Sequence, residues 1–183
     1  DKKLREEMQV ELRQLQRKVG ITFVFVTHDQ EEALTMADRI AVMSKGEVIQ
    51  VDSPSALYEQ PNSIEVAEFI GNINLLSGTV ETVGRNVMID AGQVGCLNVP
   101  VGQSKVAPGE EVALAVRPEK MQITNELPDN GYNSLRGKLI AESYAGDRSH
   151  YFLEVDGLSH RLMVANLNEL PIPTRREIDG AEE

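Results

Sequence analysis

The N-terminal part of the chain alternates between helical and extended hydrophobic patterns. Over residues 2–19, apolar side chains recur every three or four positions, which predicts an amphipathic helix. Its apolar stripe comprises Leu4, Met8, Leu12, Leu15 and Val19. Gly20 follows at a favourable C-cap position. The run Ile21–Val26 is almost unbroken in apolar and β-branched residues, which is typical of a strand buried on both faces of a parallel sheet.

A polar corner at residues 27–29 follows this predicted strand. Asp29 is suited to cap a helix that runs to about Asp38. Ligands of open α/β sheets bind just beyond the carboxyl ends of the strands. The pattern therefore places His28 at the mouth of a predicted site.

Turn and cap signals divide the next stretch. Residues 39–43 and 47–51 predict a hairpin around Lys45-Gly46. Asp52-Ser53-Pro54 predicts a helix start, because proline suits the first helical turn. A further short helix is expected over residues 63–70.

Beyond Asn72 the pattern changes to short alternating runs separated by Gly, Pro and Asn turns. Many short strands without helices predict a small barrel, and the domain boundary is expected near residues 71–74. The predicted strands are Leu76–Val83, Asn86–Asp90, Val94–Val99, Glu111–Val116, Met121–Thr124, Leu135–Ser143, His150–Val155 and Leu158–Val164.

Asp156-Gly157 is a signal for a two-residue hairpin. That turn would place Val155 opposite Leu158. It would also place Tyr151 opposite Leu162 and give the two strands a common apolar face.

Composition narrows the functional classes. The 183 residues are 41% hydrophobic, which allows a sizeable core, and no run is long enough for a membrane-spanning helix. The N-terminus has no apolar core like that of a signal peptide. The net charge is −11, and both halves of the chain are acidic, unlike the basic surface of a nucleic-acid binder. The single cysteine, Cys96, cannot form an internal disulfide, which fits a reducing compartment.

Several stretches carry a resemblance to a known family. FVTHDQEEAL, containing His28, resembles the H-loop of ATP-binding subunits of ABC transporters. ADRIAVMSKGEVIQVDSPSALYEQP resembles the strand pair and helix that close their nucleotide-binding domain. FIGNINLLSGTV and VRPEKMQI resemble the start and the Arg-Pro-Glu motif of the regulatory TOBE domain of bacterial importers. Residues 117–120, 130–133 and 144–147 are most similar to polyamine importers of the putrescine type.

The resemblance implies an α/β plus all-β fold, with part of an ABC ATPase sheet and its helices followed by a small OB-like barrel. Residues 1–72 are expected to be the C-terminal part of the nucleotide-binding domain. Residues 73–183 are expected to be the TOBE regulatory domain without its last strand. Transported substrates would be putrescine or spermidine, although sugar, iron and sulfate importers share the framework.

The sequence also departs from the family. The Walker A loop, Q-loop, signature motif and Walker B strand are absent. The nearest decoy, Gly131 to Lys138, has five intervening residues instead of four and Leu139 where a hydroxyl belongs. Asp1 matches the aspartate of the D-loop, so the chain is expected to be a fragment that begins there. Without a phosphate loop we expect no ATP hydrolysis by this chain alone.

In the intact family member, the resemblance gives His28 contact with the γ-phosphate and the attacking water. Losing one such hydrogen-bond donor typically raises the barrier by about 2.7–4 kcal/mol. The alternative is a surface or helix-capping histidine. Asp1 would lie at the dimer interface and align the opposing active site. Asp29, Glu31 and Glu32 are close enough to suggest a general base, but capping of the helix and complementing its dipole explain them better. In the family the base comes from the Walker B segment.

In the predicted regulatory domain, Arg117, Pro118 and Glu119 form the family motif. Arg117 and Glu119 could form an ion pair with a structural or a regulatory role. His150 and His160 could suggest a metal site. However, the predicted hairpin turns His160 toward Leu153, and no Cys/His cluster supports them. Cys96 is expected to be a small buried or half-buried residue.

The resemblance further implies ATP and Mg in the intact protein and no cofactor in this chain alone. The partners would be a second copy of the ATPase subunit and the membrane permease, on the cytoplasmic face of the plasma membrane. The isolated fragment is expected to dimerise or swap elements, because the strand 21–26 lacks a neighbour. Two alternatives remain: a stand-alone regulatory or interaction module without enzyme activity, and an OB-type nucleic-acid binder, which the acidic charge and sparse aromatics disfavour.

Overall fold

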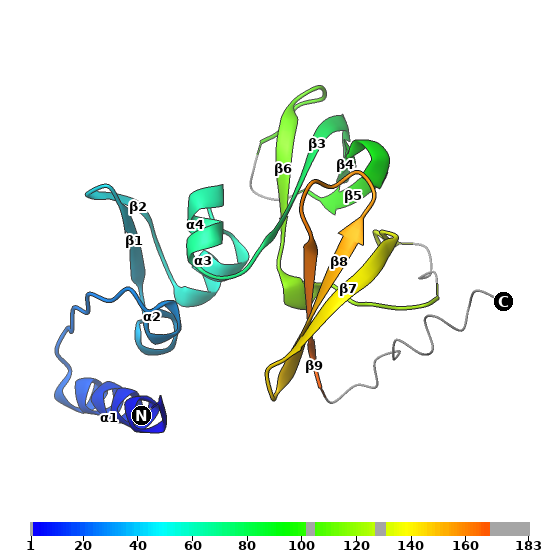
Figure 1. The fold of residues 1–183 in the computed structure, drawn as a ribbon. Helices are drawn as coiled ribbons and strands as arrows, with labels where there is room; N and C mark the ends of the chain where they lie inside the picture. Colours follow the sequence, from blue (N-terminus) through cyan, green and yellow to red (C-terminus); the bar gives the residue numbers. More distant parts are fainter. Residues whose placement is uncertain (1, 102–104, 127–130, 169–183) are drawn as a thin grey trace. The chain divides into compact units, whose positions relative to one another are not determined.

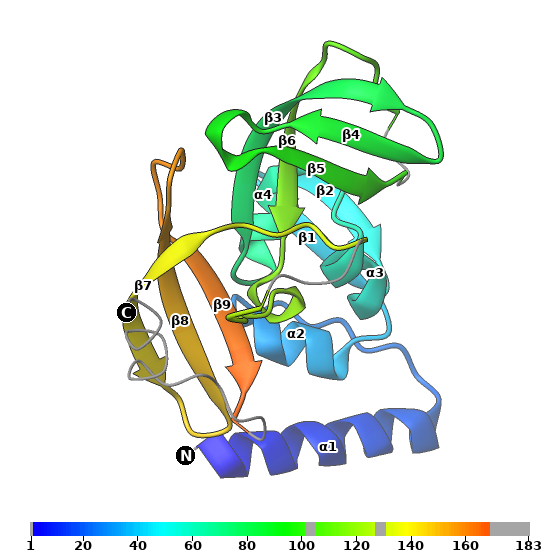
Figure 2. The same cartoon turned by 90° about the vertical axis from the view of Figure 1, so that its right-hand side faces the viewer.

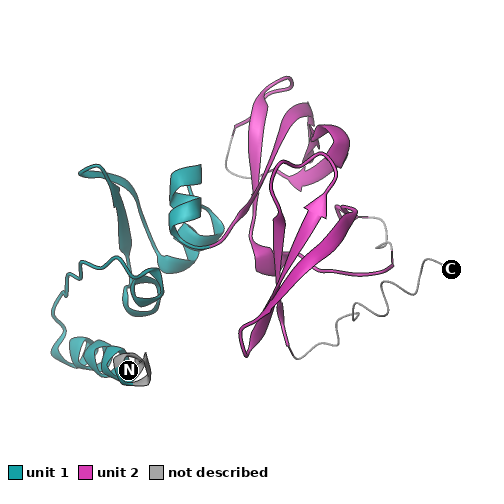
Figure 3. Ribbon diagram, viewed as in Figure 1, with its two compact units in different colours: residues 1–71 teal, residues 72–183 magenta. Residues whose placement is uncertain are grey.

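The chain divides into two compact units, which are described separately (Figure 3). Residues 1–71 form unit 1, and residues 72–183 form unit 2. The computed structural model describes residues 2–101, 105–126 and 131–168. No helix in this described part combines the length and the apolar character needed to cross a bilayer.

Unit 1 contains four helices and one hairpin among its described residues (Figure 1). These are α1 (Lys2–Val19), α2 (Gln30–Met36), β1 (Ile40–Ser44), β2 (Glu47–Asp52), α3 (Pro54–Glu59) and α4 (Ile64–Phe69). The predicted helix at residues 2–19 and the predicted hairpin are confirmed. Asp29, Ser53 and Ser63 cap α2, α3 and α4, and each side chain accepts a hydrogen bond from the backbone N–H three residues later.

A small core holds the hairpin and the last two helices of unit 1 together. Its buried members are Ile40, Val42, Leu57, Val66 and Ile70. Lys45 and Gly46 both have positive φ, at 50° and 85°, and this geometry lets two residues close the tight β1–β2 turn.

The predicted buried strand Ile21–Val26 is wrong. The segment forms no strand, and Val24 and Val26 are 85% and 98% exposed. A strand needs at least one neighbouring strand to pair with its backbone groups, and a parallel sheet also needs both faces covered. No described strand runs alongside this segment, so its hydrophobic pattern has no sheet to enter. The apolar stripe of α1 is also largely uncovered, and Leu15 is 50% exposed.

Unit 2 contains two antiparallel sheets (Figures 1 and 2). The four-stranded sheet has the order β5-β4-β3-β6, and the three-stranded sheet has the order β7-β8-β9. The strands are β3 (Asn74–Val83), β4 (Asn86–Asp90), β5 (Cys96–Pro100), β6 (Glu111–Val116), β7 (Gly137–Tyr144), β8 (Arg148–Val155) and β9 (Leu162–Leu167). A mixed α/β part followed by an all-β, OB-like part is therefore confirmed, with the sheets of unit 2 curled into a half-barrel.

One hydrophobic core joins the two sheets of unit 2. The four-stranded sheet contributes most of it, and β8 and β9 contribute one residue each. The buried members are Leu76, Val80, Val87, Ile89, Leu97, Val155 and Leu162.

Two predictions for the barrel strands are wrong. Residues 121–124 form no strand, because the chain there leaves a short 3-10 helix, Pro118–Lys120, in an extended conformation without a partner strand. The two-residue hairpin at Asp156-Gly157 is also wrong: a longer loop separates β8 from β9, and Leu162 lies opposite Leu153. The Leu158 N–H does donate to the Val155 carbonyl at 3.1 Å across this turn, but the strands do not continue from it, and Leu158 packs against the core from the loop.

The side chain of Asn74 fastens the four-stranded sheet to the three-stranded sheet. Asn74 lies at the start of β3, is only 3% exposed, and faces the backbone of Met163 in β9. Its Nδ2 donates to the Met163 carbonyl at 2.7 Å, and its Oδ1 accepts from the Met163 N–H at 2.8 Å. The amide thus satisfies a donor and an acceptor that would otherwise be left unpaired.

Asn133 makes the same pair of bonds at a solvent-exposed position. Its Oδ1 accepts from the Asn98 N–H at 2.7 Å, and its Nδ2 donates to the Asn98 carbonyl at 2.9 Å. The two asparagines therefore differ in burial but not in the kind of contact.

We expect Asn74→Ala to destabilise unit 2 much more than Asn133→Ala. A buried group that loses its partner costs about 1–3 kcal/mol, and Asn74→Ala deprives two such groups, whereas water can replace Asn133. Urea unfolding followed by circular dichroism measures the difference between the variants. Equal losses would contradict the role of Asn74 as a link between the sheets.

Candidate functional site

The candidate site is the corner between the segment 21–26 and helix α2. Thr27 and Asp29 flank His28 and are bonded to each other: the Asp29 N–H donates to Thr27 Oγ1 at 2.9 Å. The Asp29 side chain then accepts from the Glu32 N–H at 3.1 Å, which starts α2. The backbone on the C-terminal side of His28 is therefore anchored to the helix.

Glu32 ties the other side of His28 to the same helix. Thr27 Oγ1 donates to Glu32 Oε2 at 2.6 Å, so the Thr27 hydroxyl both accepts and donates. The second oxygen, Oε1, accepts from Gln9 Nε2 of α1 at 3.4 Å. Both oxygens of the Glu32 carboxylate thus accept hydrogen bonds from protein donors.

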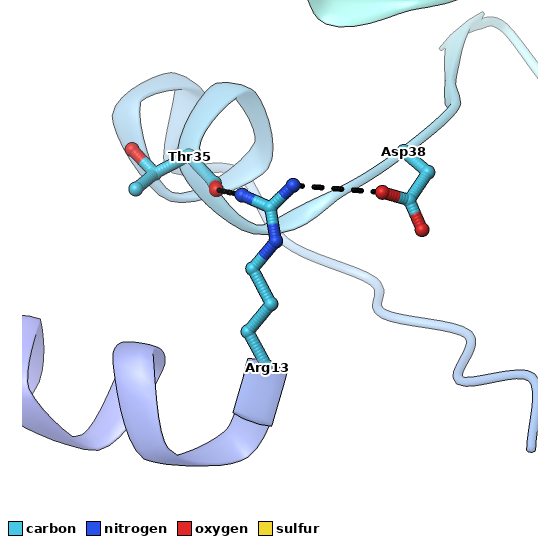
Figure 4. Close-up of polar contacts among 3 residues, drawn as sticks. All are labelled: Arg13, Thr35 and Asp38. Atoms are coloured by element: carbon cyan, nitrogen blue, oxygen red, sulfur yellow. Dashed lines mark hydrogen bonds and ion pairs between the residues drawn. The ribbon is translucent and has the colours of Figure 1, made fainter. Parts of the chain in front are cut away.

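Arg13 makes a second connection between α1 and the end of α2 (Figure 4). Its Nη1 donates to the Thr35 carbonyl at 2.6 Å, and its Nη2 lies 3.5 Å from Asp38 Oδ1. The ion pair is exposed, so it contributes only about 0–1 kcal/mol. The bond to the Thr35 carbonyl satisfies a helix-end acceptor that has no partner within the helix.

A shallow cleft of about 330 Å³ lies between α1, Phe25 and α2. It is mainly apolar, with polar atoms from Gln9 and Glu32. The lining residues are Leu4, Met8, Gln9, Leu12, Phe25, Glu32 and Met36. His28 is not among them, so the cleft and the histidine are separate features of unit 1.

His28 itself is exposed at the tip of the corner. An exposed imidazole on a backbone held from both sides can present an N–H to an oxyanion without first breaking internal bonds. The functional assignment of His28 stays a prediction at this point. Asp1, the other residue assigned by resemblance, lies outside the described residues.

The Arg-Pro-Glu motif lies where β6 ends in unit 2. Arg117 is only 6% exposed, and its Nη1 donates to the Asn72 carbonyl at 3.1 Å. Pro118 is buried and begins the 3-10 helix, which packs against β9, while Glu119 is exposed. The motif therefore joins the first residue of unit 2 to the end of β6. Its regulatory role stays a prediction.

Three further candidates from the sequence behave as follows. Cys96 is exposed, so its expected burial is wrong; it lies on β5, and alternate residues of this strand face away from the core. Partial desolvation and the nearby Glu81 carboxylate raise the pKa of the Cys96 thiol, which makes it a poor nucleophile.

The two histidines of unit 2 lie apart. His150 lies on β8, opposite Ser143 of β7 and Ala165 of β9. His160 lies in the loop before β9, so the predicted position of His160 opposite Leu153 is wrong. Within the described residues, no group of three His, Cys, Asp or Glu side chains could hold a metal ion.

The sequence did not indicate that Gln9, Arg13 and Thr27 would hydrogen-bond to α2 or to the corner before it. Asp29 and Glu32 do carry a local signal, since their spacing matches a capping box. Gln9 and Arg13 carry none, because their partners lie more than 20 residues away in the chain.

Comparison with known proteins gives matches in both units. The TOBE domain family model matches residues 114–175. The spermidine/putrescine import ATP-binding protein PotA of Rubrobacter xylanophilus is 47% identical over 167 residues, which are 88% of this chain and 43% of that protein. The proteins of the same name from Thermobifida fusca and Chromobacterium violaceum are 46% and 45% identical, over 82% and 91% of this chain and 39% and 46% of their own lengths.

The chain thus spans less than half the length of these curated relatives. Its resemblance to importer ATP-binding subunits and to the TOBE domain is confirmed. The chain belongs to the family of ABC importer ATP-binding subunits that includes the spermidine/putrescine import ATP-binding proteins, and it corresponds to their C-terminal part.

Proposed function

We propose that this chain acts as the C-terminal part of the ATP-hydrolysing subunit of an ABC importer for polyamines such as spermidine or putrescine. The observation that carries the proposal is the corner at residues 27–32, which holds His28 exposed between two anchored flanks. The names of the relatives support the polyamine class, since each is an import ATP-binding protein for spermidine and putrescine.

In this role His28 donates a hydrogen bond from its imidazole toward the γ-phosphate and contacts the attacking water. The corner fits that task, because a donor fixed before the reaction stabilises developing charge without reorganisation cost. The described residues do not by themselves fit bound ATP and Mg. The sequence has no phosphate loop, and the described residues include no metal-binding cluster. In the complete protein other segments would hold both, and Asp1 would contact the opposing active site of a second copy.

We further propose that residues 1–72 are the C-terminal part of a nucleotide-binding domain and that residues 73–183 form a TOBE regulatory domain. The separation of the chain into units 1–71 and 72–183 and the family match at residues 114–175 support this division. The missing last strand is a prediction that concerns residues outside the described part. In this division Arg117 holds Asn72, just before the first strand of the regulatory domain, and the 3-10 helix that contains Pro118 and Glu119 packs against β9.

The proposed partners are a second copy of the ATPase subunit and the permease of the importer. The proposed location is the cytoplasmic face of the plasma membrane, reached through the permease. Closing of the two ATPase subunits around nucleotide would then drive the permease.

We expect His28→Ala to lower ATP turnover about 100- to 1,000-fold in a complete subunit that contains the phosphate loop, because one donor to the transition state is lost. His160→Ala, at another exposed histidine, is the matched control and retains activity. Phosphate release measures both, and unchanged turnover of the His28→Ala subunit would refute the proposed role. The 183-residue chain alone should release no phosphate, and activity that His28→Ala abolishes would contradict this.

We expect the 183-residue chain to self-associate through the segment 21–26, by dimerisation or by exchange of elements. Val24 and Val26 are almost fully exposed, and no described strand covers the backbone of the segment. Light scattering at micromolar concentration should report a dimer, and Val24→Lys should shift it toward monomer. Val83→Lys, at an exposed valine of unit 2, is the control. A monomer in the unaltered chain argues against the proposal.

A further inference from the structure

The hydrogen bonds around His28 form a closed circuit in which Glu32 takes part twice. Its backbone N–H donates to Asp29, and its side chain accepts from Thr27. Thr27 in turn accepts from the Asp29 N–H. Removing the Glu32 carboxylate therefore takes away the acceptor of the Thr27 hydroxyl, whereas the Asp29 side chain still accepts from the backbone N–H of residue 32 and caps the helix.

The bond between Thr27 and Glu32 is the shortest one in this circuit. The Oγ1–Oε2 distance is 2.6 Å, which is typical of a hydroxyl donating to a charged carboxylate. Charge-assisted bonds of this kind are about twice as strong as neutral ones, and partial burial limits competition from water. The circuit thus depends on the Glu32 carboxylate, which accepts its shortest bond.

Gln9 extends the circuit to α1. Its amide donates to the oxygen of Glu32 that Thr27 leaves free. Glu32 also lines the cleft between α1 and α2, beside Gln9. The side chain of the neighbouring Glu31 is exposed, and the Glu31 backbone carbonyl accepts from the Thr35 hydroxyl. Two adjacent acidic residues of one helical turn therefore have different surroundings.

We propose that Glu32 is a positioning residue that fixes the imidazole of His28 through Thr27. This inference rests on the proposed contact of His28 with the γ-phosphate. Glu32 touches neither His28 nor any reacting atom. It holds the residue before His28, while Asp29 holds the residue after it, so the backbone at His28 has little freedom to rotate. Loss of the carboxylate releases one side and moves the imidazole away from its reactive position.

The matched variants separate this role from a general effect on the helix. Glu31→Ala and Glu32→Ala each remove one negative charge from the first turn of α2, so both lose the same interaction with the helix dipole. Only Glu32→Ala also removes the acceptor of Thr27. Thr27→Val removes the hydroxyl at nearly constant volume, and Thr27→Ser keeps it.

The first experiment measures ATP turnover of these variants in a complete subunit. Misplacement of a reacting group by about 1 Å costs about 100-fold, so we expect Glu32→Ala and Thr27→Val each to lower kcat about 10- to 100-fold with little change in KM. Thr27→Ser and Glu31→Ala should retain activity. The Thr27→Val/Glu32→Ala double variant should lose less than the product of the two single losses, because both substitutions break the bond between Thr27 and Glu32.

Two results would overturn the inference: Glu32→Ala no slower than Glu31→Ala, or losses that multiply in the double variant. A merely structural role would lower the melting temperature together with kcat. If His28→Ala keeps full turnover, the proposed function of His28 fails. If His28→Ala is inactive while Glu32→Ala is active, only the positioning role of Glu32 fails.

A second measurement uses the 183-residue chain and needs no activity. Hydrogen exchange followed by NMR should show faster exchange of the Asp29 amide in Glu32→Ala than in Glu31→Ala, because Thr27 no longer holds its acceptor oxygen in place. Equal protection in the two variants would contradict the proposed circuit even if the complete subunit failed to fold.

Discussion

The need to pair every buried backbone polar group shapes both units of this protein. Where a strand or a helical turn does not supply the partner, a side chain does. The Asn74 amide takes the place of a neighbouring strand for Met163. At the start of α2, the Thr27 hydroxyl accepts from the Asp29 N–H, and the Asp29 carboxylate accepts from the Glu32 N–H. Apolar burial draws the elements together, but these polar contacts decide where the elements can end and turn.

The same constraint links the fold to the candidate chemistry. A histidine at the tip of an unsupported loop would change position easily, and its donor would be of little use to a reaction. Here two short side chains and one carboxylate restrict the corner, although the preceding segment 21–26 has no sheet around it. The order of the corner is therefore local, and it does not depend on the strand that the sequence predicts.

Local patterns predicted local structure well. The spacing of apolar residues indicated the helix at residues 2–19. Asp29 caps α2 as predicted, and α3 begins at the predicted Ser53-Pro54 start. All these contacts span a few residues, so their signals lie within a short window of sequence. The H-loop resemblance likewise indicated His28, but it gave no hint of the bonds from Gln9 and Arg13, whose partners are distant in the chain.

The failures share a non-local cause. Segment 21–26 has the composition of a buried strand, yet a strand requires neighbours that its own residues cannot specify. The β8–β9 register differs from the prediction because Leu158 reaches the core from the loop, which makes the connection longer than two residues. Cysteine is usually buried in protein cores, but Cys96 occupies an outward-facing position on β5 and is exposed. The hydrophobic pattern of a segment limits the secondary structures that it can form, and the neighbouring elements of the fold decide which of them it adopts.

The outer edge of β5 affects whether unit 2 can aggregate by pairing with a strand of another molecule. In this edge strand every second residue directs its backbone groups away from the sheet: Cys96, Asn98 and Pro100. The Asn133 amide already occupies both groups of Asn98, and proline has no N–H to offer. A foreign strand that approached this side would find one donor, at Cys96, and could not continue the ladder. Unit 2 is thereby protected on this side from amyloid-like stacking without the use of charged residues.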